Sequence, residues 1–400
     1  MRVWYCQIPC EGFTNVRILA FLFLAFAGLL AMAAQATQTQ PPIRVGASIS
    51  RSGSLASAGE MYEKGLRLWQ RDVNARGGMQ GRLVELVLHD DASTPEKAAE
   101  AYAALIDNKK ADLLLGPVDN SLAMAVVPVL ERTQTPCLFA MPASDSLWKN
   151  GKGLVFSVIA PMAEWPDGFF ELIARAGYER MALIIVDHPQ GERVRTNTAK
   201  WIRRYGLRLV SESLIQARDV AHALEQARHA EAEVVTVWGT QEGSTRTLRT
   251  LKNMAWKPKA VYASTTMFQH NLHALSSREM NGVFTAIPWE ARMAAAYPGG
   301  SAFVTAFRSA YSQEPEVLAA SAYASGQLLE AALTKGGNKG KEAFRQTLST
   351  LDTVTILGRY GVDAGGMQLR QFPLTEQWQK GKREIVWPDE LKTARPVLPR

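Results

Sequence analysis

The chain has 400 residues, of which 47% are hydrophobic and 21% charged, a composition typical of a globular protein long enough for two domains. The formal net charge is +7, but the basic residues are spread along the chain. The densest basic groups, at 193–208 and 335–345, have helical spacing with apolar interruptions, and we interpret them as solvent-facing helix surfaces. Nucleic-acid binding is not expected, because it requires a focused basic stripe. Binding of an anionic ligand or of an anionic membrane surface is the alternative that the net charge leaves open.

The N-terminus has the features of a secretory signal peptide. Arg17 precedes an apolar block from Ile18 to Leu30, and two small-x-small sequences, AMA (31–33) and AQA (34–36), follow the block. Because the block is short for a bilayer span, we favour a cleavable signal peptide over residues 1–36 and export to the periplasm. The alternative is an uncleaved anchor.

Cysteine usage agrees with an exported protein that does not depend on disulfides. Cys6 and Cys10 precede the apolar block and would leave with the signal peptide. Cys137 lies within the apolar stretch PCLFAMP and is expected to be a small core residue rather than a nucleophile. No cysteine directly follows the block, so a lipoprotein anchor is not expected.

The first part of the exported chain alternates apolar strands with amphipathic helices. After Pro41-Pro42, the stretch IRVGASIS predicts a buried strand, and a loop rich in Ser and Gly joins it to a helix predicted over 58–75. The next strands, RLVELVLHDD, DLLLG and PCLFAM, alternate with helices that begin at Ser93 and span 121–132. Such alternation favours a parallel sheet covered by helices on both faces.

A second series repeats this pattern and is followed by helices and a hairpin. Its predicted strands are MALIIVDH, LRLVSESL, EVVTVWG, KAVYAST and GVFTAIP. Helices are expected over 301–311, 317–334 and 341–350, and antiparallel strands joined by a turn at Lys380-Gly381-Lys382 follow them. Two such series, each with its own core, predict two lobes with a cleft between them, because ligands gather at the carboxyl ends of parallel strands.

Four stretches of the sequence resemble a known family. They are IRVGASISRSGSLASAGEMYEKGLRLWQRDVNARGGMQGRLVELVLHDDAS, DLLLGPVDNSLAMAVVPVLE, TPCLFAMPAS and VTILGRYGVDAGGMQLRQF, of which the first is the most specific. These residues resemble the periplasmic solute-binding proteins of ABC importers, in the group that binds leucine, isoleucine, valine and related amino acids or amides. The resemblance covers essentially the whole mature chain.

The resemblance implies an α/β fold of two Rossmann-like parallel-sheet lobes joined by three crossovers, with the ligand cleft between them. We place the crossovers near Ser157, Ile287 and Gly358. The expected organisation is a signal peptide at 1–36, lobe 1 at 43–156 plus 289–357, lobe 2 at 157–288 plus 358–390, and a C-terminal tail at 391–400.

Matched position by position, the family's ligand pocket falls on few residues of this chain. Ser121, at the start of its helix, matches a hydroxyl that binds the ligand carboxylate. The remaining expected ligand-binding residues are Ser52, Ser54 and Ser57 in the opening loop, Ala143, Ser144 and Asp145 on the next wall of lobe 1, and Gln190, Thr240 and Thr265 on lobe 2.

Three departures from the family pattern bear on the ligand. Where amino-acid binders place a Tyr after the VDH-like strand, this chain has PQGER. Where they place an acidic residue for the α-ammonium, it has Thr265 and Thr266, and Asp145 stands where a Thr is typical. These changes disfavour an ordinary branched-chain amino acid and fit an acid without an α-amino group, an amide, or an amine held differently.

The mechanism that the resemblance implies is capture by a monomer, without metal or cofactor. The lobes would close on a small polar or carboxylate-bearing solute and deliver it to the membrane permease of an ABC importer. The alternative within the same architecture is a sensor that passes closure to a separate signalling partner. Trp148, Trp165, Trp238 and Trp289 lie near predicted cleft edges or crossovers, where they pack in the core or stack on the ligand.

Catalytic and nucleotide-binding functions have weaker support. The opening loop resembles an anion cradle, but GxGxxG and GxxxxGK[ST] are absent from the chain. Ser146 and Lys149 spell S-x-x-K, a spacing found in some serine hydrolases, but no K-T-G follows. His270 and His273 lack neighbouring acids, and we interpret His89-Asp90-Asp91 as a strand-end turn rather than a metal site.

Overall fold

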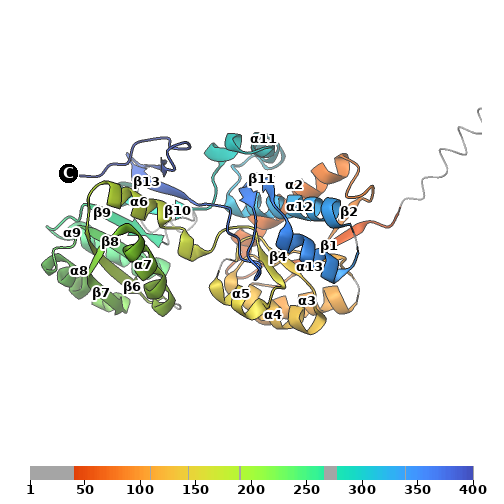
Figure 1. Cartoon of the computed structure of the whole chain (residues 1–400), viewed down its shortest axis with the longest axis horizontal. Helices are drawn as coiled ribbons and strands as arrows, with labels where there is room; N and C mark the ends of the chain where they lie inside the picture. The colour runs from red at the N-terminus through yellow and green to blue at the C-terminus, as the bar shows by residue number, and fades with distance from the viewer. Residues whose placement is uncertain are drawn as a thin grey trace, which may run out of the picture.

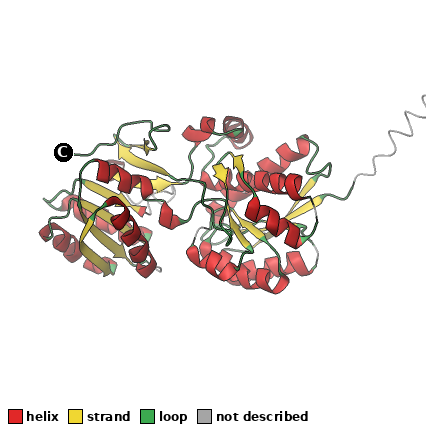
Figure 2. Cartoon of the chain, in the orientation of Figure 1, coloured by secondary structure: helices red, strands yellow, loops and turns green. Residues whose placement is uncertain are grey.

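The computed structural model describes residues 40–108, 110–142, 144–188, 191–264, 277–337 and 339–399. Two α/β lobes lie beside each other along the long axis of the molecule, and extended segments connect them (Figure 1). Helices flank the strands of both lobes (Figure 2). The predicted signal peptide lies outside the described residues. Within them, no helix has both the length and the hydropathy needed to cross a membrane.

The first lobe is built on parallel strands in the order β2-β1-β3, and β4 and β5 form a further parallel pair. A bridge between Leu115 and Leu138 continues the ladder from β3 to β4. The strands are β1 (Ile43–Ile49), β2 (Val84–Asp90), β3 (Leu113–Leu114), β4 (Cys137–Phe139) and β5 (Val155–Ser157). β11 (Thr353–Thr355) and β12 (Gly358–Tyr360) form an antiparallel pair, so residues 358–360 stay with residues 353–355 rather than beginning the other lobe as predicted. The helices of this lobe are α2 (Ala56–Ala75), α3 (Pro95–Asp107), α4 (Asn120–Thr133), α5 (Asp145–Gly151), α11 (Gly300–Tyr311), α12 (Val317–Gly336) and α13 (Lys341–Thr350).

Helices α2 and α12 pack closely because glycines face the partner helix at their contact. A Cβ atom on Gly65 would lie 2.3 Å from the carbonyl oxygen of Ala319, and one on Gly326 would lie 2.1 Å from Cδ2 of Trp69. The Trp69 ring is fully buried in this seam. Helix α12 comes late in the chain and completes the lobe that begins with α2.

The second lobe is built on a seven-stranded sheet in the order β14-β13-β10-β9-β8-β6-β7. Its strands are β6 (Arg180–Val186), β7 (Arg208–Ile215), β8 (Val234–Gly239), β9 (Ala260–Ala263), β10 (Val283–Ile287), β13 (Leu374–Gln379) and β14 (Lys382–Trp387). Its helices are α6 (Asp167–Arg175), α7 (Gly191–Tyr205), α8 (Val220–His229), α9 (Gln241–Asn253) and α10 (Ser277–Met280). β6 to β10 are parallel, and β13 and β14 form the predicted antiparallel hairpin, with Lys380 and Gly381 at positive φ in its turn.

Two buried glutamines tie together the segments that run between the lobes. Gln371 accepts a hydrogen bond from the backbone N–H of Ala160 at 2.9 Å and donates one to the carbonyl of Pro288 at 2.8 Å. Gln368 donates to the carbonyl of Val158 at 3.1 Å. Residues from three distant parts of the sequence therefore meet at one polar junction.

The hydrophobic core is continuous between the two lobes, whereas the sequence predicts a separate core for each lobe. One large cluster of buried residues extends from the first lobe onto one face of the seven-stranded sheet, where it includes Leu183 and Ile185 of β6. A smaller cluster covers the opposite face and includes Ala182 and Ile184. The prediction of a separate core for each lobe is therefore wrong for one face of the second sheet. Cys137 is buried as predicted, and burial raises the pKa of its thiol well above the usual value.

Candidate functional site: a cavity between the two lobes

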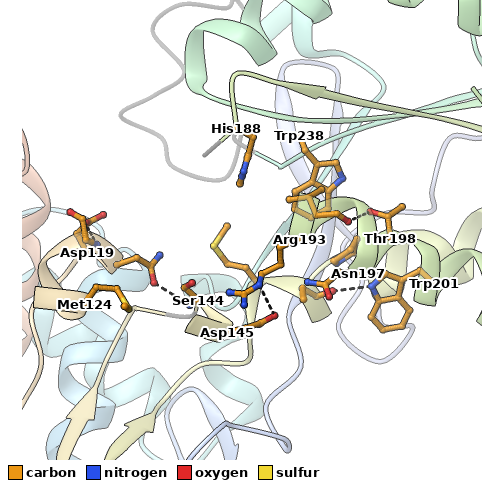
Figure 3. A pocket seen from close by; sticks show the side chains of 16 residues that line it. Asp119, Met124, Ser144, Asp145, His188, Arg193, Asn197, Thr198, Trp201 and Trp238 are labelled. Carbon is orange, nitrogen blue, oxygen red and sulfur yellow. Dashed lines mark hydrogen bonds and ion pairs between the residues drawn. The ribbon is translucent and has the colours of Figure 1, made fainter. Parts of the chain in front are cut away.

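A cavity of about 470 Å³ opens between the lobes, within the size range of small-ligand pockets. Its walls comprise Asp119, Asn120, Ser121, Met124, Ser144 and Asp145 from the first lobe, and Met162, Ala163, Pro166, His188, Arg193, Val194, Asn197, Thr198, Trp201 and Trp238 from the second (Figure 3). Most of these residues lie at or beyond the carboxyl ends of β3, β4, β6 and β8. The cavity thus lies where the strand order predicts a cleft.

The first-lobe wall is organised around the start of α4. Asp119 Oδ1 accepts hydrogen bonds from the backbone N–H of Ser121 at 2.7 Å and from its hydroxyl at 2.6 Å, so Asp119 caps the helix. Asn120 Oδ1 accepts a bond from the N–H of Ser144 at 3.1 Å, which joins the loops after β3 and β4. The predicted residues Ser121, Ser144 and Asp145 are therefore brought together on one wall.

The facing wall is one side of α7. Arg193, Asn197 and Trp201 follow each other at i, i+4 spacing and so point from the same face of the helix. Trp201 Nε1 donates to the carbonyl of Ala163 at 2.9 Å, and its ring stacks on Tyr205 with 6.3 Å between centroids. Because Trp201 is 1% exposed and held by these contacts, it supports the α7 wall from behind and fixes its position.

An ion pair crosses the cavity between the two lobes. Nε of Arg193, in the first turn of α7, lies 3.6 Å from Oδ2 of Asp145, the first residue of α5 (Figure 3). The side chains of Arg193 and Asp145 are 34% and 35% exposed, respectively. The pair is therefore partly shielded from water, which strengthens it relative to a pair on the open surface.

Two further side chains of the second lobe face the cavity. Burial lowers the pKa of His188, so its imidazole is neutral near pH 7. Trp238 is nearly buried, and its ring centroid lies 5.7 Å from that of Tyr262. Across the described ranges, the buried Nε1 of Trp238 has no hydrogen-bond partner.

The opening loop, with Ser52, Ser54 and Ser57, lies outside the residues that line this cavity. Carboxylates at the end of β2 hold the loop instead. Asp91 is buried and accepts hydrogen bonds from the hydroxyls of Ser48, at 2.7 Å, and Ser50, at 2.6 Å. Asp90 accepts one from the hydroxyl of Ser52 at 3.3 Å. Backbone hydrogen bonds, led by that of Ala92, lower the pKa of Asp90. His89 and Asp90 are the last residues of β2, and the turn follows Asp91 at Ala92-Ser93, so the predicted strand-end turn lies slightly later in the chain.

The remaining predicted residues do not all lie in the cavity. Thr240 does not line the cavity; it caps α9 by accepting a bond from the N–H of Gly243 at 3.2 Å. Ala143, Gln190 and Thr265 lie outside the described residues. Ser146 pairs with the hydroxyl of Ser144 at 2.6 Å, whereas Lys149 is exposed. Of the four tryptophans considered, Trp238 lines the cavity, and Trp148, Trp165 and Trp289 are buried outside its lining.

Sequence reasoning missed most of the α7 wall. The sequence predicts that the basic group at 193–208 faces solvent. This prediction is wrong for Arg193, which lines the cavity. The signal that could have found it is the stripe of Arg193, Asn197 and Trp201 directly after the strand end of β6. Polar and aromatic residues on one helix face next to a parallel strand end are typical of a ligand wall.

Comparisons with known proteins give the family and the fold. The model of the family described as periplasmic binding protein matches residues 42–381. A Leu/Ile/Val-binding protein homolog 7 from Brucella suis biovar 1 (strain 1330) is 24% identical over 397 residues, covering 94% of this chain and 98% of the relative.

Two solved structures share the fold. An ABC transporter solute-binding protein from R. palustris, in complex with benzoate, matches with a TM-score of 0.68 and 20% identity, covering 89% of this chain and 99% of its own. An ABC transporter substrate-binding protein from Desulfitobacterium hafniense, in complex with Leu, matches with a TM-score of 0.73 and 21% identity, covering 86% of this chain and 100% of its own. The expected two-lobe α/β fold is confirmed.

Proposed function

The chain belongs to the periplasmic binding protein family, and from this premise we propose that it is the extracytoplasmic solute-binding component of an ABC importer. The observation that carries the proposal is the cavity between the lobes, whose walls come from strand ends on both sides. A solute that contacts both walls favours the closed arrangement, and hinge closure around a ligand is the motion known for periplasmic binding proteins.

The proposed ligand is a small polar or carboxylate-bearing solute, such as an amino acid, an amide or a related organic acid. Ser121 and Asn120 on the first lobe offer hydroxyl and amide groups to it, while Met124, Trp201 and Trp238 offer apolar surface. The relatives' ligands support this range, since similar folds hold Leu in one case and benzoate in another.

The proposed setting follows from the same family. We expect the mature protein to act as a monomer in the periplasm after removal of residues 1–36, and to deliver its solute to a membrane permease. Capture requires no chemical step, and the hydroxyl of Ser146 pairs with Ser144 in the structure.

Native mass spectrometry of the exported protein, purified gently without added ligand, tests the proposal. We expect one small molecule per chain, which dissociates on partial unfolding and refolding of the protein and rebinds when it is returned. A chain that carries no small molecule, and whose thermal unfolding is unaffected by a panel of amino acids, amides and organic acids, would refute the proposed function.

A further inference from the structure

We infer that Arg193 is the specificity-determining residue of the cavity, that its terminal nitrogens bind the carboxylate of the solute, and that Asp145 is the positioning residue that orients it. The solute class is then a monocarboxylate with an apolar or aromatic body and no α-ammonium group. This inference rests on the proposed function, because it assigns the chemistry of the solute held in the same cavity.

The geometry of the ion pair leaves one edge of the guanidinium available. Asp145 approaches Arg193 at Nε, with 3.6 Å between Nε and Oδ2. In the described part of the chain, no other group forms a hydrogen bond or ion pair with Arg193. Nη1 and Nη2 together carry four N–H donors, and this fork matches the two oxygens of a carboxylate.

Among the charged residues that line the cavity, Arg193 is the one that can bind a negatively charged group of the solute. Asp119 is committed to capping α4 through its bonds to Ser121. Asp145 is committed to Arg193, and His188 is neutral because burial lowers its pKa. The lining residues therefore hold one cation with donors to spare, and one negative charge on the solute complements it.

The same arrangement disfavours an α-amino acid. An ammonium group would have to pair with Asp145, the carboxylate that is not capping a helix, and would then lie within a few Å of the Arg193 guanidinium. Both cations would then share one carboxylate, so the ammonium would weaken the contact that positions the Arg193 guanidinium. A carboxylate without an ammonium meets no such opposition.

The remaining lining residues describe the body of the solute. Met124, Met162, Val194, Trp201 and Trp238 are apolar or aromatic residues from both lobes that line the same cavity as the charged pair. Trp201 is fixed by its bond to Ala163 and is almost fully buried, so it supports this apolar wall from behind. Flat or branched apolar bodies pack on such a surface, and their carboxylate then extends toward Arg193.

The experiment measures selectivity by isothermal titration calorimetry with four probes: benzoate, benzamide, 4-methylpentanoate and leucine. We expect the wild-type protein to bind each carboxylate about 10- to 100-fold more tightly than its neutral or zwitterionic counterpart, the range that a charge-assisted hydrogen-bond pair supplies. Arg193→Met should abolish this preference. Asp145→Asn should reduce the ratio of benzoate to benzamide affinity, a readout that a purely structural role would not change.

Arg195→Met is the matched control, because Arg195 lies on the same helix and pairs with Glu192 and Glu212 outside the cavity. It should leave the selectivity unchanged. An Arg193→Met protein that keeps the carboxylate preference, or a wild-type protein that prefers leucine or benzamide, would overturn the inference.

The solute that copurifies with the protein separates the two proposals. A molecule without a carboxylate, identified by native mass spectrometry, would overturn the inference and leave the proposed function intact. A protein that retains no molecule, and whose thermal unfolding is unaffected by the panel of amino acids, amides and organic acids, would instead refute the proposed function. A copurified monocarboxylate that Arg193→Met no longer retains, while Arg195→Met does, supports both.

Discussion

The substitution Glu376→Gln should change how the stability of the protein depends on pH. Glu376 lies on β13, is 0% exposed, and has Arg383 at 3.2 Å and Arg292 at 3.6 Å as ion-pair partners. Within the described residues, neither of its carboxyl oxygens accepts a hydrogen bond. Burial raises its pKa to about 8; the nearby Glu290 carboxylate also raises this pKa, and the guanidinium of Arg383 opposes the shift.

The sign of the pH effect follows from this raised pKa. The folded state binds the Glu376 proton below pH about 8. The unfolded state binds it only below the ordinary pKa of 4.5. Between these values the folded state holds more protons, so the contribution of Glu376 to stability is full below pH 4.5 and is lost as the pH rises toward 8. The loss is at most about 1.4 kcal/mol per pH unit.

The assay is urea denaturation of the ligand-free protein, followed by circular dichroism at pH 5, 6, 7 and 8. A glutamine stays neutral, so the free energy of unfolding of Glu376→Gln should rise relative to wild type as the pH increases. Glu384→Gln is the control, because Glu384 contacts the same Arg292 at 3.0 Å and is more exposed than Glu376. A difference between Glu376→Gln and wild type that stays constant or shrinks with pH would refute the reasoning.

Three further predictions concern the cavity, the polar junction and the helix seam. Ser121→Ala should weaken solute binding by about 1–3 kcal/mol, because we expect the hydroxyl, which donates to Asp119 in the structure, to donate to the solute carboxylate when the solute binds; unchanged affinity by calorimetry would remove Ser121 from the site. Gln371→Leu leaves two buried backbone groups unpaired and should lower the free energy of unfolding in urea by about 1–3 kcal/mol for each; wild-type stability would show that the junction is not held this way. Gly326→Ala places a methyl group 2.1 Å from the Trp69 ring and should cost about 1–3 kcal/mol of stability; an unchanged thermal midpoint would contradict the close packing of α2 and α12.

Local patterns predicted the elements of the fold well. The helix predicted over 341–350 is observed as Lys341–Thr350, and that predicted over 317–334 extends to Gly336. Both have boundary signals in the sequence itself, such as Gly340 before α13 and Gly337 after α12. The family resemblance places Ser121, Ser144 and Asp145 on one wall of a cleft, and it supplies what local patterns alone do not.

Contacts between distant segments could not be predicted in this way. The hydroxyl of Ser52 meets Asp90 because β1 and β2 are adjacent in the sheet, and the sequence of the loop carries no sign of that partner. Arg193 is distinguished from the other basic residues of its helix by Asp145, which lies on the other lobe. Its role depends on how the two lobes face each other, and this arrangement is not encoded in a local pattern.

The central claim is that a solute is held in the cavity between the two lobes. A crystal structure of the protein with its copurified solute tests it most directly. The account predicts one molecule in contact with the start of α4, at Asn120 or Ser121, and with the α7 wall, at Arg193 or Trp201. A solute bound elsewhere, with this cavity empty in a protein that calorimetry shows to be saturated, would contradict it.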